Sequence, residues 1–311
     1  MEKRKLIIAG AGGVVGRHLV TVAQESYDIT VLTRKIDGDE PVGTTPVAWN
    51  PRAAKEKADN ALSELAEVLS GAFAVINLAG ASIDDGRMDD EHKNRVLESR
   101  VDSTDTLVEA FKRADAPPPA WFNASAVGYY GDRGDEVLLE TSSAQDTFFL
   151  SKVSQAWEDA ARQIEGETRL IIGRLGLVLA KDAPAWEKFI MPIKLFVGGP
   201  LGDGKQWYAW IDADDLARGV LYLLEHPEAQ GVYNFTAPNP VRQLTLTKKA
   251  AEKLGRPAFV PAPAFALQII LGGLADALLL PSARALPTRL EAVGFTFKQA
   301  TIDEEMARLF S

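Results

Sequence analysis

The amino-terminal part of the chain combines a short apolar run with a helical pattern. The run covers residues 6–9 and leads into a cluster of glycines. Apolar residues then recur at helical spacing, at Val14, Val15, Leu19, Val20 and Val22. The run predicts a buried β-strand, and the spacing predicts an amphipathic helix that packs against it.

The same alternation continues through the first half. Further strands are predicted at residues 28–34, 47–50, 73–78, 120–124 and 169–175, and helices at 58–69, 89–114 and 149–163. Strands that alternate with helices are typical of βαβ units. Because such crossovers are right-handed, they build a doubly wound parallel sheet. We therefore predict an α/β protein with a Rossmann-like fold.

The second half of the chain has a less regular pattern. Helices are predicted at residues 187–197, 213–225 and 245–254, strands at 206–211 and 231–235, and a last short helix after the capping-box pattern at 301–304. We expect residues 1–175 to form the main domain. Residues 176–311 are expected to form mainly a smaller C-terminal lobe, intermingled with that domain, with some elements returning to the main sheet.

The apolar segment over residues 261–281 raises the question of a membrane span. Gln268, Gly272, Gly273 and Asp276 interrupt it, so no uncharged run reaches spanning length. We interpret the segment as buried helices. An apolar face that binds a partner is the alternative.

Composition narrows the class of protein. The chain has 311 residues, 46% of them hydrophobic, a net charge of −9 and no cysteine. The charge argues against a nucleic acid or an anionic membrane as partner. Without cysteine there are no disulfides, thiol catalysts or cysteine zinc sites. The N-terminus leads straight into a strand, without a secretory pattern, so we expect a soluble cytoplasmic protein.

The glycine cluster has the spacing of a dinucleotide-binding loop. Gly10 can make a tight turn, Gly13 lets the backbone approach a pyrophosphate, and Gly16 lets the helix pack close to the strand. The N–H groups of Val14 and Val15 then point towards the phosphates from the helix N-terminus. An ordinary glycine-rich turn is the alternative.

The end of the second strand indicates which cofactor binds. An acidic residue at this place binds the ribose of NAD, whereas an arginine accommodates the 2′-phosphate of NADP. Here the strand ends in Thr33, Arg34 and Lys35, without an acid. We predict NADP(H), with Thr33 and Arg34 at the site and Arg34 as the main selector. The alternative is that Arg34 is a solvated loop residue.

The fourth predicted strand ends in small residues. Leu78, Ala79 and Gly80 follow Asn77 directly. Ligands of doubly wound sheets bind outside the carboxyl ends of the strands, so we place these three residues at the cofactor crevice. The alternative is a simple turn from strand to loop.

Several blocks together resemble the extended branch of the short-chain dehydrogenase/reductase superfamily. They are residues 10–16, 77–82, 98–101, 123–131, 156–158, 198–202, 237–240, 254–257, 261–263 and 289–295. In combination they are similar to an epimerase-like family labelled NAD-dependent epimerase/dehydratase, or cell-division inhibitor. The resemblance implies a Rossmann-like fold and a small-molecule substrate, of which a nucleotide-sugar-like compound is one candidate. The word epimerase rests on fold analogy there.

The same resemblance identifies the places where catalytic residues are expected. Members of the superfamily use a Tyr-x-x-x-Lys pair, whose phenol exchanges a proton with the substrate, together with an upstream serine and an asparagine. Lys152 keeps the lysine place, but Phe148 stands where the tyrosine belongs. Ser125 is the candidate serine, in a register that also admits Ala126. Arg100 takes the place of the asparagine, and we expect it at the cofactor.

Replacements for the missing phenol lie near Ser125. Tyr129 or Tyr130 is a candidate donor, although one of the two is expected to be a packing residue. Glu158 is a candidate base or a solvated acid on a packed helix. Arg174 would bind an anionic substrate or pair with an acid.

The C-terminal half has its own candidates. Lys205, Gln206 and Trp210 lie where this branch lines its substrate pocket, whereas Asp212 is expected to cap a helix. The three histidines are scattered among predicted helices, so we predict no histidine catalysis and no metal site.

Two functions remain open from the sequence. The first is an NADP(H)-dependent oxidoreductase or epimerase-like enzyme with hydride chemistry at the nicotinamide. The second is a non-catalytic, NADP(H)-responsive binding or regulatory protein, which Phe148 favours. Substrate, reaction direction and assembly stay open, with a homodimer as one expectation.

Overall fold

A central parallel sheet organises the protein. The computed structural model describes residues 3–86 and 88–311. Seven strands lie in the order β11-β7-β5-β4-β1-β2-β3, and all pairs are parallel. The strands are β1 (Arg4–Ala9), β2 (Tyr27–Thr33), β3 (Thr45–Ala48), β4 (Ala74–Asn77), β5 (Ala120–Ala126), β7 (Arg169–Leu175) and β11 (Gly231–Phe235). The strand order reverses between β1 and β4, as in a Rossmann sheet, which confirms the predicted α/β class.

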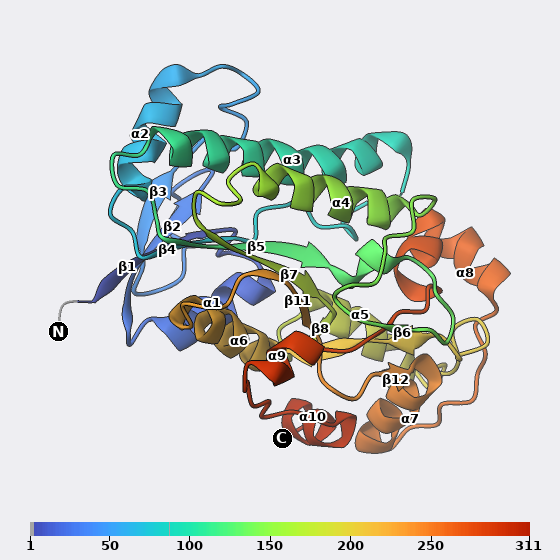
Figure 1. Ribbon diagram of the computed structural model, residues 1–311. Helices are drawn as coiled ribbons and strands as arrows, with labels where there is room; N and C mark the ends of the chain where they lie inside the picture. The colour runs from blue at the N-terminus through green and yellow to red at the C-terminus, as the bar shows by residue number, and fades with distance from the viewer. Residues whose placement is uncertain (1–2, 87) are drawn as a thin grey trace.

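Helices cover both faces of this sheet (Figure 1). One face carries α2 (Asp59–Leu69), α3 (Asp90–Arg113) and α4 (Phe149–Arg162), and the other carries α1 (Val14–Ala23) and α6 (Ala213–Glu225). Side chains of β1 alternate between them: Leu6 and Ile8 join the core under α1 and α6, whereas Ile7 and Ala9 join the core under α2 and α3. Burial on both faces explains why the strands read as continuous apolar runs.

The C-terminal lobe packs around a separate core. Its helices are α5 (Pro184–Lys194), α7 (Gln243–Leu254), α8 (Ala264–Leu271) and α10 (Ile302–Leu309), whereas α9 (Thr288–Ala292) packs on β11 of the main sheet. Short strands complete the lobe: β6 (Val137–Leu138), β8 (Leu177–Leu179), β9 (Trp207–Tyr208), β10 (Trp210–Asp212), β12 (Val241–Arg242) and β13 (Arg284–Ala285). Trp186, Trp210, Leu246 and Met306 lie in its core. Helix α6 packs against the main sheet, and β11 is one of its strands. The chain therefore passes from this lobe to the main sheet and back again.

Two stretches differ from the sequence-based expectation. The predicted strand over residues 206–211 is broken at Ala209, whose carbonyl accepts a hydrogen bond from the Leu177 N–H group at 2.8 Å. The prediction of buried helices over residues 261–281 is wrong for α8, where Phe265 is 65% and Ile269 is 79% exposed. The reason is that α8 packs mainly on the π-helical turn η2 (Ala275–Leu279) and not on the sheet.

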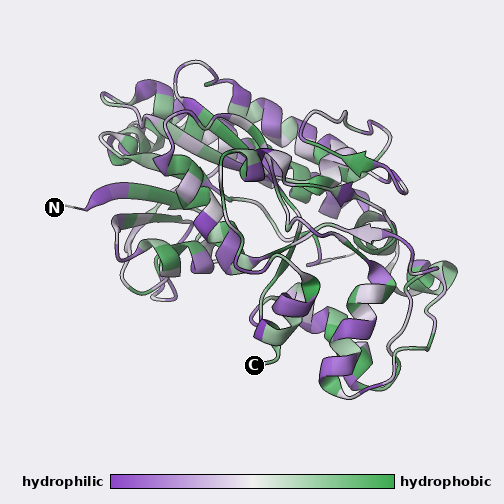
Figure 2. Ribbon diagram, turned by 60° about the horizontal axis from the view of Figure 1, so that its bottom comes forward, coloured by the Kyte–Doolittle hydropathy of each residue, from purple (hydrophilic) through white to green (hydrophobic). Residues whose placement is uncertain are grey.

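The distribution of hydropathy follows this layering. Figure 2 shows hydrophobic colour along much of the central sheet, while the outer helices carry hydrophilic and hydrophobic segments side by side. Within residues 3–86 and 88–311, no helix combines the length and apolar character that crossing a membrane requires.

Candidate cofactor site

The loop between β1 and α1 depends on two glycines for its shape. Gly10 has φ +89°, and a Cβ atom there would lie 2.8 Å from the backbone carbonyl carbon of Leu78. A Cβ atom on Gly16 would lie 2.5 Å from the Cα atom of Ala11. Backbone contacts that close exclude any side chain. The protein's own packing therefore accounts for both glycines.

Gly13 has no such explanation within the described chain. Its φ is −74°, which any residue adopts, and a Cβ atom would meet only the Gly10 carbonyl oxygen, at 3.6 Å. Gly13 is also the N-cap of α1 and provides no side-chain cap. The first N–H groups of a helix lack partners within it and attract anions. The loop thus combines bare backbone with the positive end of a helix, which fits a dinucleotide pyrophosphate.

The segment after β4 forms the opposite wall. Leu78 donates its N–H group to the Ala9 carbonyl at 2.9 Å, and Ala79 donates to the side-chain oxygen of Asn77 at 3.1 Å. The amide nitrogen of Asn77 donates in turn to Thr104 and Asn123, and the Asn77 side chain is fully buried. Asn77 therefore sets the conformation of Leu78–Gly80 beside the glycine loop.

Arg100 of α3 lies against this wall. A Cβ atom on Gly80 would come within 3.0 Å of the Arg100 side chain, and the guanidinium donates to the Ala81 carbonyl at 3.0 Å. Burial lowers the pKa of Arg100 to about 10, which still leaves it charged at neutral pH. No carboxylate pairs with it among the residues that the structure describes. A cation without an acidic partner beside the crevice is suited to an anionic ligand.

The end of β2 carries a second cation. Arg34 is exposed just beyond β2, and no ion pair involves it in the described part of the chain. The hydroxyl of Thr33 donates to the Lys35 carbonyl at 2.8 Å, which turns the chain at this point. Since β1, β2 and β4 are parallel neighbours, Arg34, the glycine loop and Leu78–Gly80 lie at the same edge of the sheet.

Ser125 belongs to a buried network and does not meet Lys152. Its side chain is 2% exposed and donates to Glu158 of α4 at 2.8 Å. Glu158 is fully buried and forms an ion pair with Arg174 at 2.8 Å. Lys152 is exposed on α4, four residues after Phe148, the N-cap of that helix. The sequence makes Glu158 a candidate base and Arg174 a candidate ligand of an anionic substrate. In the structure the two side chains form an ion pair with each other.

The two tyrosines after β5 differ in their surroundings. Tyr130 is fully buried, donates to Asn234 at 2.7 Å and accepts a hydrogen bond from Arg174 at 3.1 Å. Burial raises the pKa of Tyr130 above its ordinary value, against the effect of Arg174. Tyr129 is partly exposed, and its ring centroid lies 3.3 Å from the guanidinium carbon of Arg174. Of the two tyrosines, Tyr129 is the one that is partly exposed.

The candidates of the C-terminal half also separate. Asp212 accepts a hydrogen bond from the Asp215 N–H group at 2.9 Å and caps α6, which confirms its structural role. Trp210 is fully buried, and Gln206 donates to the carbonyls of Leu201 and Leu279. Lys205 is exposed. Among the described residues, no group of three His, Asp or Glu side chains is arranged to hold a metal ion.

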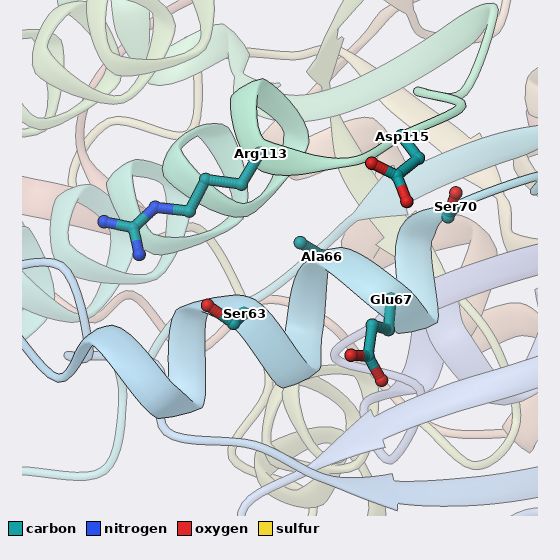
Figure 3. A pocket seen from close by; sticks show the side chains of 6 residues that line it. All are labelled: Ser63, Ala66, Glu67, Ser70, Arg113 and Asp115. Carbon is teal, nitrogen blue, oxygen red and sulfur yellow. The ribbon is translucent and has the colours of Figure 1, made fainter.

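Two surface hollows lie away from this edge. One is lined by Ser63, Ala66, Glu67, Ser70, Arg113 and Asp115, which come from the second half of α2, the end of α3 and the residues after these helices (Figure 3). The other lies between α1 and α6, beside Tyr27 at the start of β2. Both are at the amino ends of strands, whereas ligands of such sheets bind at the carboxyl ends. Neither hollow belongs to the cofactor site.

Comparison with known proteins shows the family of the chain. The model of the NAD dependent epimerase/dehydratase family matches residues 6–235, from the first buried residue of β1 to the end of β11. The chain belongs to the NAD-dependent epimerase/dehydratase family. A domain of unknown function, DUF1731, matches residues 262–309. The resemblance inferred from the sequence blocks is therefore confirmed at the level of the family.

Relatives of this epimerase/dehydratase family member are similar to it over nearly its whole length. An epimerase family protein of Staphylococcus epidermidis is 36% identical over 297 residues, which cover 95% of each chain. One from Staphylococcus aureus is 35% identical over 303 residues, 96% of each chain. The crystal structure of the human epimerase family protein SDR39U1 with NADPH is similar with a TM-score of 0.87 at 27% identity, covering 98% of this chain and 99% of the human one.

Proposed function

We propose that the protein binds NADP(H) in the crevice between the glycine loop and Leu78–Gly80, and that it is an oxidoreductase or epimerase-like enzyme. The observation that carries this proposal is Gly13, whose missing side chain nothing inside the described chain requires. The human relative crystallised with NADPH supports the choice of cofactor. When bound, the nicotinamide supplies a hydride donor or acceptor.

Different residues of the chain bind different parts of the cofactor. The N-terminus of α1, at Val14 and Val15, binds the pyrophosphate. Arg34 binds the 2′-phosphate through charge-assisted hydrogen bonds, and Arg100 adds a second positive charge beside Gly80. Both cations are free to do so because neither is paired with a carboxylate in the part of the chain that the structure describes.

The role of Arg34 is tested by exchanging it for alanine. We expect R34A to weaken NADPH binding about tenfold or more, because a charge-assisted contact is lost, and to leave NADH binding nearly unchanged. Arg113→Ala is the matched control, since Arg113 is a partly exposed arginine at the opposite edge of the sheet. Fluorescence titration with both cofactors measures the two dissociation constants. An equal loss for NADPH and NADH would remove Arg34 from the selector role.

A second function is favoured by the missing phenol. Phe148 has no proton to exchange, Lys152 is exposed, and the Ser125 hydroxyl is bonded to Glu158. A site without the usual acid and base suits a protein that binds NADP(H) and responds to it without turnover. In the enzymatic alternative, Tyr129 is the candidate proton donor, because it is the more exposed of the two residues.

The two functions are separated by a turnover assay. The protein with bound NADPH is mixed with a panel of carbonyl compounds, including nucleotide sugars that carry a keto group, and the absorbance of NADPH is followed. Turnover that disappears in Tyr129→Phe supports the enzyme, and turnover with any compound refutes the binding-only function. Tyr130→Phe serves as the matched control, because Tyr130 is buried.

A further inference from the structure

Helix α5 of the C-terminal lobe is tied to both loops that border the crevice. Asp182, just before α5, pairs with Arg17 of α1 at 2.6 Å. Lys188 within α5 pairs with Asp84, which follows Gly80 in the chain, also at 2.6 Å. One tie thus reaches the helix of the glycine loop, and the other reaches the segment beyond β4.

The first tie acts on the glycine loop itself. Arg17 also donates to the carbonyl of Gly12 at 2.7 Å, so a single guanidinium joins the loop backbone to Asp182. His18 lies between Asp182, at 3.1 Å, and Asp214 at the start of α6, at 2.5 Å. The hydrogen bond with Asp214 raises the pKa of His18 despite its partial burial. His18 thus gives Asp182 a second partner on α1.

An apolar contact accompanies the two ties. Val14, the first residue of α1, packs against the buried cluster that contains Trp186 and Ile190 of α5. The same end of α1 carries the N–H groups assigned to the pyrophosphate. Figure 1 shows α5 on the side of the sheet towards which the arrow of β5 points, the side of the strands' carboxyl ends. Residues in and just before α5 therefore contact both segments that border the proposed pyrophosphate site.

We propose that α5 is a two-point clamp over the cofactor's pyrophosphate, with Arg17, Asp84, Asp182 and Lys188 as its positioning residues. This inference rests on the proposed function. Both ties join groups of the chain to each other, so they hold α5 closed whether the cofactor enters or leaves. Each passage of NADPH needs α5 to move, and the ties set how often it does.

The clamp has a kinetic signature that a direct ligand contact lacks. In Lys188→Gln and in Asp182→Asn, we expect the association and dissociation rates of NADPH to rise together, each by about two- to fivefold, because exposed ion pairs are individually weak. The dissociation constant stays nearly the same. The double variant combines both effects. Stopped-flow fluorescence measures association, and displacement by excess NADP⁺ measures dissociation.

A matched control comes from the far side of the lobe. Lys249 of α7 pairs with Asp303 at 2.6 Å and is partly exposed, but it does not touch the crevice. Lys249→Gln is expected to leave both rates unchanged. Thermal unfolding of each variant shows whether the fold is intact.

The outcomes distinguish the two proposals. Unchanged rates in both tie variants, or a rise in dissociation alone, overturn the clamp. A rise in both rates with Lys249→Gln also overturns it, because the effect would then not belong to α5. If the unaltered chain does not bind NADPH at millimolar concentration, the proposed function falls, and the clamp falls with it.

Discussion

Gly13 and Gly16 belong to one loop, but different causes explain them. A side chain on Gly16 would overlap backbone atoms of residues 10 and 11, whereas a side chain on Gly13 would meet no atom closer than 3.6 Å. Folding therefore requires Gly16, and in our proposal the ligand requires Gly13. The spacing of glycines in the sequence suggests both roles without telling them apart.

Two alanine substitutions test this division. We expect Gly16→Ala to lower the free energy of unfolding by about 2 kcal/mol or more, as overpacking does. Gly13→Ala should leave stability nearly unchanged and weaken NADPH binding about tenfold, because a methyl group would hold the phosphates away from the N-terminus of α1. Urea unfolding and fluorescence titration measure the two quantities. Equal stability loss in both variants would contradict the division.

The side-chain contacts of the residues near β5 could not be predicted from the sequence. Ser125 and Lys152 were chosen from a pattern, yet their side chains do not meet, and Ser125 bonds to Glu158. Which side of a strand end a hydroxyl faces depends on register, and one inserted residue reverses it. Glu158 and Arg174 pair across β7 and α4, a contact between distant segments that no local spacing reveals. Their roles towards a substrate stay predictions.

At the scale of elements, a local sequence signal predicts the structure well where all the interacting residues lie close together in the chain. The capping box at Thr301 and Glu304 is present at the start of α10, because both partners lie within one turn. Helix α8 was predicted less well. Its residues are apolar except Gln268, so the pattern indicates burial without indicating which element covers the helix, and the structure leaves Phe265 and Ile269 exposed.

Helix α10 also carries an acid whose charging opposes folding. Burial raises the pKa of Glu305 to about 7, although Arg308 partly offsets this. The folded state then holds the proton more tightly than the unfolded state between about pH 4.5 and pH 7. Over that window we expect Glu305 to reduce stability as pH rises, by up to about 1.4 kcal/mol per pH unit. Glu305→Gln should remove this slope, as urea unfolding at several pH values would show.

The neighbouring Glu304 is a control, because its pKa is shifted in the opposite direction. Hydrogen bonds from the backbone and hydroxyl of Thr301 lower the pKa of Glu304 below its ordinary value. Its contribution is therefore present above the unfolded-state pKa and is lost as pH falls. Glu304→Gln should reduce stability at neutral pH and have less effect in acid. If both glutamines shifted the profile in the same direction, the assignment of Glu305 would be wrong.

At the scale of the whole molecule, the chain does not divide cleanly after residue 175. Helix α6 supplies Leu216, Val220 and Leu223 to the core beneath the sheet, and β11 pairs with β7. We expect a fragment of residues 1–175 to expose this face and the edge of β7, and to aggregate. The complete chain should be monodisperse and unfold cooperatively. Size-exclusion chromatography and circular dichroism compare them, and a monomeric fragment with a cooperative transition would contradict the expectation.

The order of strands in space also differs from their order of synthesis. β1 leaves the ribosome first and occupies an interior place, and the sheet then extends outwards on both sides of it. β3 completes one edge early, whereas β11, at residues 231–235, completes the other only after about three quarters of the chain has emerged. Until then β7 presents unpaired backbone groups. During this long interval of synthesis, the unpaired edge of β7 is therefore the place where the nascent protein is at risk of aggregation.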